Sequence, residues 1–195
     1  MHSYRKPWTF TRKFTAKKGQ AGFLKRLDEA RGFFPELDRE TVKVGITINA
    51  DGKADLQGKA VYFRSRNVSY YVMGHELTHL LQEIQGLPKS ERSCDIFTLA
   101  RTVLFCDESP NYVKVPKEMV DENGFILDHY REFVHKTARS SSALRRAGKR
   151  FYISWFERTL KAALELEAKE QYEVNDTPEW MLLNEPIQTT LEEFI

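Results

Sequence analysis

The stretch from residue 67 to residue 85 constrains the fold most, because its apolar side chains recur at helical spacing. They occupy positions i, i+4, i+7, i+8 and i+11, namely Met73, Leu77, Leu80, Leu81 and Ile84. An α-helix brings such positions onto one side. Gly86 and Pro88 then end the pattern. We therefore predict a helix from about Asn67 to Gln85 whose apolar side packs on the core.

The opposite side of this predicted helix carries two histidines. His75 and His79 are four residues apart, so both imidazoles can reach one metal ion. Glu76 is turned about 100° from His75 around the helix axis and can instead contact a metal-bound water. This is the His-Glu-x-x-His pattern. It predicts His75 and His79 as zinc ligands and Glu76 as the general base of a metallopeptidase.

A third ligand is expected, because catalytic zinc usually takes three from the protein. Glu91 and Asp95 lie in the next predicted helix, which runs from Ser90 to about Phe105. If a tight turn joins the two helices, Asp95 is closer than Glu91 to the level of His79. We therefore slightly favour Asp95 as the metal ligand and Glu91 as its partner. The plainer alternative is that Glu91 favours the helix N-terminus and Asp95 pairs with an arginine.

The two motifs resemble those of a known class of enzyme. Residues 72–81 resemble the extended zincin signature, and Glu91 with Asp95 resembles the second motif of the gluzincins and of ImmA/IrrE-type peptidases. That resemblance implies that Glu91 binds zinc and that Asp95 orients a ligand histidine. The chain departs from those families in its short gap, only twelve residues from His79 to Glu91. SprT-like proteases have a comparably short gap, but their third ligand is a histidine. None occurs here between His79 and His129.

Two short segments before the histidine helix have the pattern of β-strands. Residues 41–48 alternate and are rich in β-branched side chains, and Ala60–Phe63 is a second candidate. The second segment resembles the edge strand along which zincins align extended substrates. An amphipathic helix is predicted over residues 23–34, ahead of Pro35.

The remainder of the chain is predicted to be mainly helical. Residues 128–169 have helical character, with breaks expected near 140–142 and at Gly148. We therefore expect an α+β fold. A zincin-like catalytic domain with a small sheet and a central His-Glu-x-x-His helix would cover residues 1–125. A helical appendage with an acidic tail, packed on the same core, would follow over 126–195.

Several other residues have a possible role at the site. Peptide hydrolysis needs a donor for the developing oxyanion besides the metal; the candidates are Tyr112, His129, Tyr130 and His135. Cys94 is interpreted as a buried helix residue rather than a redox switch. Twelve residues of helix would separate it from Cys106 by about 18 Å, so no disulfide is expected.

Charge and hydropathy favour a cytoplasmic enzyme acting on a protein or peptide. The formal net charge is +2, no apolar run approaches the roughly 20 residues that cross a bilayer, and no signal peptide is recognisable. An alternative is a DNA-associated factor with a structural or subsidiary zinc site, using the basic N-terminal segment and a second basic cluster. The cluster consists of Arg139, Arg145, Arg146, Lys149 and Arg150.

Another alternative is a latent protease. In that case the basic N-terminal segment or the acidic tail, residues 171–195, would lie across the cleft. Nothing in the sequence indicates an oligomeric state.

Overall fold

The computed structural model describes residues 8–16, 21–64 and 67–176. The chain divides into two compact units, Met1–Leu160 and Lys161–Ile195, and the helix α6 runs over Tyr152–Asp176. The predicted division between residues 125 and 126 stays a prediction. So does latency, because the start of the basic N-terminal segment and most of the acidic tail lie outside the described residues.

The first unit contains a four-stranded mixed sheet, so the predicted α+β class is confirmed. Its strand order is β1-β2-β4-β3, with β1, β2 and β4 parallel and β3 antiparallel to β4. The strands are β1 (Trp8–Phe10), β2 (Val42–Ile46), β3 (Gly52–Asp55) and β4 (Ala60–Phe63).

The expectation that Ala60–Phe63 forms an edge strand is wrong. This segment is β4, and its Val61 pairs with Val44 of β2 on one side and with Ala54 of β3 on the other. The edge strand beside the histidine helix is β3. Its sequence, Gly-Lys-Ala-Asp, contains no β-branched or aromatic residue, so the strand gives no signal that sequence patterning detects.

The helices of the first unit lie where the sequence predicts them, but one of them is shorter than predicted. The predicted helices at 23–34 and 67–85 are confirmed as α2 and α3, whereas the one at 90–105 ends at Leu99 and a separate 3-10 turn follows. The elements are α1 (Arg12–Thr15), α2 (Ala21–Gly32), η1 (Pro35–Leu37), α3 (Tyr70–Ile84), α4 (Glu91–Leu99), η2 (Val103–Cys106), η3 (Lys117–Met119) and α5 (Asp128–Arg146).

Of the two expected breaks in the C-terminal helical segment, one is confirmed and one is wrong. Gly148, with φ of 79°, lies in the turn between α5 and α6. No break occurs at 140–142, because Ser141 and Ser142 are buried within α5. The hydroxyl of Ser141 donates to the carbonyl of Tyr152 at 2.7 Å, which gives this serine a partner inside the protein.

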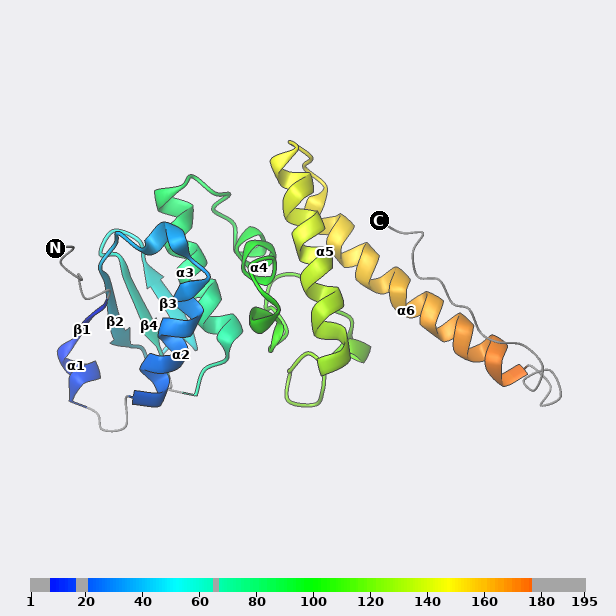
Figure 1. The fold of residues 1–195 in the computed structure, drawn as a ribbon, viewed down its shortest axis with the longest axis horizontal. Coiled ribbons are helices and arrows are strands. Elements are labelled where there is room, and N and C mark those ends of the chain that lie inside the picture. The colour runs from blue at the N-terminus through cyan, green and yellow to red at the C-terminus, as the bar shows by residue number, and fades with distance from the viewer. Residues whose placement is uncertain (1–7, 17–20, 65–66, 177–195) are drawn as a thin grey trace. The chain divides into compact units, whose positions relative to one another are not determined.

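The helices α2 and α3 lie beside the sheet (Figure 1), and the core residues that these elements bury are apolar and aromatic. Phe14, Phe23 and Phe63 form a chain of rings with centroids 5.7 and 5.5 Å apart. The apolar face of α3 is buried as predicted except at Ile84, which is 41% exposed. This packing fixes α3 against the sheet and leaves its other side for the histidines.

The helix α4 lies close to α3 because Gly74 has no side chain. A Cβ at this position would be 2.9 Å from the Phe105 ring and 3.0 Å from a methyl carbon of Thr98. Across the same contact, Thr98 Oγ1 donates to Thr78 Oγ1 at 2.9 Å. This approach brings the first turn of α4 within reach of the histidines.

Both cysteines are free and buried. They do not share one helix, because α4 ends at Leu99 and Cys106 belongs to η2. Within the described ranges, none of the helices combines the length and the apolar character that a bilayer crossing requires.

Candidate metal centre

Three side-chain atoms from two helices converge on one point. The Nε2 atoms of His75 and His79 are 3.1 Å apart, and Oε2 of Glu91 lies 3.1 Å from each of them. His75 is buried and His79 half-buried, whereas 46% of the Glu91 side chain is exposed. The result is a nearly equilateral triangle of two ring nitrogens and one carboxylate oxygen, open to solvent on the Glu91 side.

Asp95 lies behind His75 rather than in this triangle. Its Oδ1 is 3.0 Å from Nδ1 of His75, on the far edge of the ring from Nε2. Asp95 was favoured from the sequence because a tight turn between the two helices would put it near the level of His79 along the helix axes. That level does not determine which way the side chain points. In the structure, Asp95 packs behind the ring, and the longer side chain of Glu91 extends from the first turn of α4 to the nitrogens.

Asp95 is completely buried and fully bonded. Its Oδ1 accepts a hydrogen bond from the Tyr71 hydroxyl at 2.6 Å, and its Oδ2 accepts from the backbone N–H groups of Tyr112 and Val113 at 2.8 and 3.0 Å. Burial lowers the pKa of His75, but the hydrogen bond and charge of Asp95 outweigh it, so this pKa is raised. The same carboxylate makes His75 a stronger electron donor.

Gln82 holds the second histidine in a corresponding way. Its Oε1 lies 2.8 Å from Nδ1 of His79, while its Nε2 donates to the carbonyl of Pro88 at 2.7 Å. The second bond fixes which end of the amide faces the ring, because only the NH₂ end can donate to a carbonyl. His79 therefore meets an oxygen acceptor at Nδ1.

These partners determine the tautomer of both imidazoles. In the neutral form of each ring, the Nδ1 that faces an acceptor carries the proton, which leaves a lone pair on Nε2. When both rings are neutral, the two lone pairs and the Glu91 carboxylate face one another with no proton between them. Such a set of acceptors is suited to a cation.

Glu76 is buried next to this triangle and is not part of it. Burial raises its pKa to about 7, with the Glu91 charge adding to the shift and His75 opposing it. Gly52 of β3 lies against this side chain, and a Cβ there would be 2.7 Å from Cγ and 2.8 Å from Cδ of Glu76. The absence of a side chain at Gly52 thus makes room for the Glu76 carboxylate.

Of the four candidates for an oxyanion donor, Tyr112 lies against the site. Its ring stacks on His75 with centroids 6.2 Å apart, it is half exposed, and the charge of Glu91 is the main cause of its raised pKa. His129 and Tyr130 contact each other with ring centroids 4.2 Å apart. His135 is 2.7 Å from the carbonyl of Leu99 through its Nδ1.

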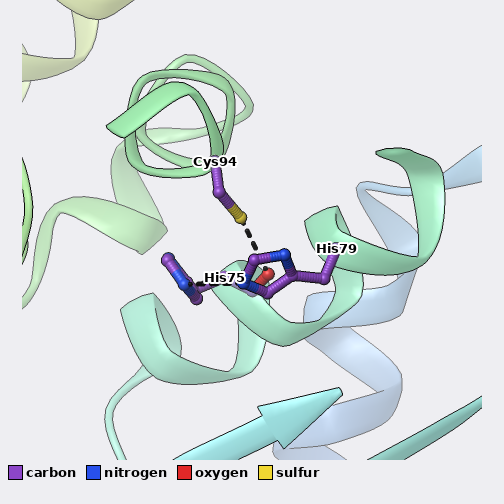
Figure 2. Close-up of side chains that lie close together, drawn as sticks. All are labelled: His75, His79 and Cys94. Atoms are coloured by element: carbon purple, nitrogen blue, oxygen red, sulfur yellow. Dashed lines mark hydrogen bonds between the residues drawn. The ribbon is translucent and has the colours of Figure 1, made fainter. Parts of the chain in front are cut away.

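Cys94 also lies near the histidines (Figure 2). Its sulfur and one nitrogen of each histidine are within 4.8 Å of one another. The thiol, however, is used in a hydrogen bond to the backbone carbonyl of His75 at 3.3 Å, and burial raises its pKa well above the ordinary value. A thiol in this condition resists the deprotonation that metal binding requires.

No protein-family model, curated protein or solved structure matches the chain.

Three residues that shape this site were not predicted from the sequence. Tyr71 lies one helical turn before His75, and Gln82 lies three residues after His79. Their spacing on α3 could have indicated that they contact the two histidines. Gly52 carried no usable signal, because its importance comes from the pairing of β3 beside α3.

Asp95 and Glu91 should differ sharply in their effect on the stability of the metal-free protein. Asp95→Ala leaves the Tyr71 hydroxyl and two backbone N–H groups without their acceptor. We expect it to lower the free energy of unfolding by roughly 3 kcal/mol in urea titrations with a chelator present. Glu91→Ala should change it by less than about 1 kcal/mol, because Glu91 is exposed. Equal losses from the two variants would contradict this division of roles.

Proposed function

We propose that the chain is a zinc-dependent metalloendopeptidase of the zincin type, in which His75, His79 and Glu91 hold the metal and Glu76 is the general base. The observation that carries this proposal is the triangle of acceptor atoms, together with the Nδ1 partners that turn both lone pairs toward it. The sequence slightly favoured Asp95 as the third ligand. Glu91 takes that place in the proposal, and Asp95 orients His75.

The donor set fits zinc. Tetrahedral ligands bound at 2.0–2.1 Å are about 3.3 Å apart, close to the 3.1 Å edges of the triangle. Two neutral imidazoles and one carboxylate suit zinc among the common metals, and three protein ligands are the number found in catalytic sites. When bound, zinc supplies an acidified water and polarises the carbonyl of the peptide bond.

Glu76 would move the proton in the reaction. Its buried carboxylate accepts a proton from the attacking water and afterwards delivers it to the leaving amine. Gly52 and the surrounding core hold this carboxylate in one place, so little reorganisation accompanies the transfer. Tyr112, half exposed beside His75, is positioned to donate its hydroxyl proton in a hydrogen bond to the oxyanion.

The substrate would bind along β3. This strand is at the edge of the sheet, and its first residue, Gly52, adjoins the general base. An extended peptide paired to this edge gains main-chain hydrogen bonds regardless of its sequence, and its scissile bond can then lie next to Glu76. The proposed substrate class is accordingly an unfolded or extended segment of protein.

Replacement of the general base tests the proposed chemistry. Glu76→Gln keeps the size of the side chain but removes the proton acceptor, so cleavage of a denatured protein should fall by about 100-fold or more. Zinc content measured by mass spectrometry should stay at one ion per chain. Glu83→Gln, on an exposed position of the same helix, is the matched control and should retain activity. Full activity in Glu76→Gln, or none in the zinc-loaded wild type, would refute the proposal.

Gly52→Ala tests the placement of Glu76 without removing it. The added methyl group occupies the space of the Glu76 side chain, and a displacement of about 1 Å can cost on the order of 100-fold in rate. We expect kcat/KM to fall at least about tenfold while zinc content is unchanged. The control is Gly22→Ala, where an added Cβ meets no atom within 4 Å. Wild-type activity in Gly52→Ala would show that this contact does not position the base.

A further inference from the structure

A second feature of the first unit lies outside the candidate metal centre. A hollow of about 720 Å³ opens where the loop after α3, the C-terminal end of α4 and the face of α5 meet. We call it the arginine hollow, because four arginines line it. They are Arg101, two residues after the end of α4, and Arg139, Arg145 and Arg146 of α5.

The described residues neutralise the positive charge of the arginine hollow only in part. Among the described lining residues, Glu36 is the one carboxylate, and both of its oxygens are occupied by Arg101, at 2.9 and 3.0 Å. Within the described ranges, no carboxylate forms an ion pair with Arg139, Arg145 or Arg146. The guanidinium of Arg145 lies 6.0 Å from the ring centre of Tyr152.

The three arginines of α5 are gathered by helical spacing. Residues 139, 142, 145 and 146 fall at i, i+3, i+6 and i+7, which places them along one face. Ser142, the small residue of this set, is buried and lines the hollow together with the three arginines. Cations held together without a counter-charge repel one another, and a bound anion removes that repulsion.

The lining of the hollow also contains apolar residues, one of which is an exposed aromatic ring. Phe33 is 37% exposed, and its ring contacts Phe105 edge to face with centroids 5.7 Å apart. Leu87 and Phe97 also line the hollow and are half-buried. A hollow that combines apolar and aromatic side chains with arginines is suited to a ligand that has both rings and negative charges.

We propose that the arginine hollow binds single-stranded nucleic acid, with a base against Phe33 and phosphates on the arginines of α5. Stacking on aromatic rings and basic contacts to the backbone are the two means by which single strands are held. A duplex offers no free base face to such a hollow. The basic residues continue beyond the hollow at Lys149 and Arg150, in the turn after α5, which favours a polymer over a single nucleotide.

The test is fluorescence anisotropy of a labelled 15-nucleotide single strand with the full chain. In Arg139→Gln/Arg146→Gln, affinity should fall at least about tenfold. The slope of log affinity against log salt should shrink by about 1.4, which corresponds to two lost phosphate contacts. Phe33→Leu keeps the apolar volume but removes the ring, and should lose about tenfold without changing the salt slope.

The matched control is Lys43→Gln/Lys136→Gln. It also removes two positive charges, but from exposed positions outside the hollow, and it should change affinity less than about twofold. An equal loss in this control would overturn the proposal, since net charge alone would then explain binding. It would also be overturned if a duplex, a mononucleotide or polyglutamate of equal charge competed as well as the single strand.

Discussion

The rest of the site depends on the hydrogen bonds that the buried carboxylate of Asp95 accepts. It is fully buried, yet it joins three separate parts of the chain: Tyr71 and His75 on α3, the loop at Tyr112 and Val113, and its own helix α4. Because it faces Nδ1 of His75, the lone pair of that ring points to His79 and Glu91. One buried charge thus fixes both the packing of the loop and the orientation of the His75 ring.

The site also requires that α3 and α4 lie in close contact, because Glu91 of α4 must reach the two histidines of α3. Gly74 allows the approach, and the bonded hydroxyls of Thr78 and Thr98 satisfy the polar groups inside it. Glu91 in the first turn of α4 thereby comes within 3.1 Å of both histidines. Gln82 of α3 donates a hydrogen bond to the carbonyl of Pro88 in the loop between α3 and α4. The same side chain faces Nδ1 of His79 and so orients that ring.

The sequence predicted the helix of the site well and the surroundings less well. His75, Glu76 and His79 are close together in one helix, where local periodicity determines both position and face. The geometry around Glu91 and Asp95 depends on how two helices are joined and on side-chain length, which periodicity does not report. The edge strand β3 was missed because four residues without β propensity form a strand only by pairing with β4. The roles of Gly52 and Gln82 likewise arise from contacts between elements.

The central claim is that two imidazoles and the Glu91 carboxylate, without Cys94, form the metal site. The most direct measurement is X-ray absorption at the zinc edge on the zinc-loaded full chain. We predict a first shell of nitrogen and oxygen atoms alone at about 2.0–2.1 Å, with the outer-shell scattering of two imidazoles. A sulfur atom at about 2.3 Å, or a shell lacking the signature of two imidazoles, would contradict the account.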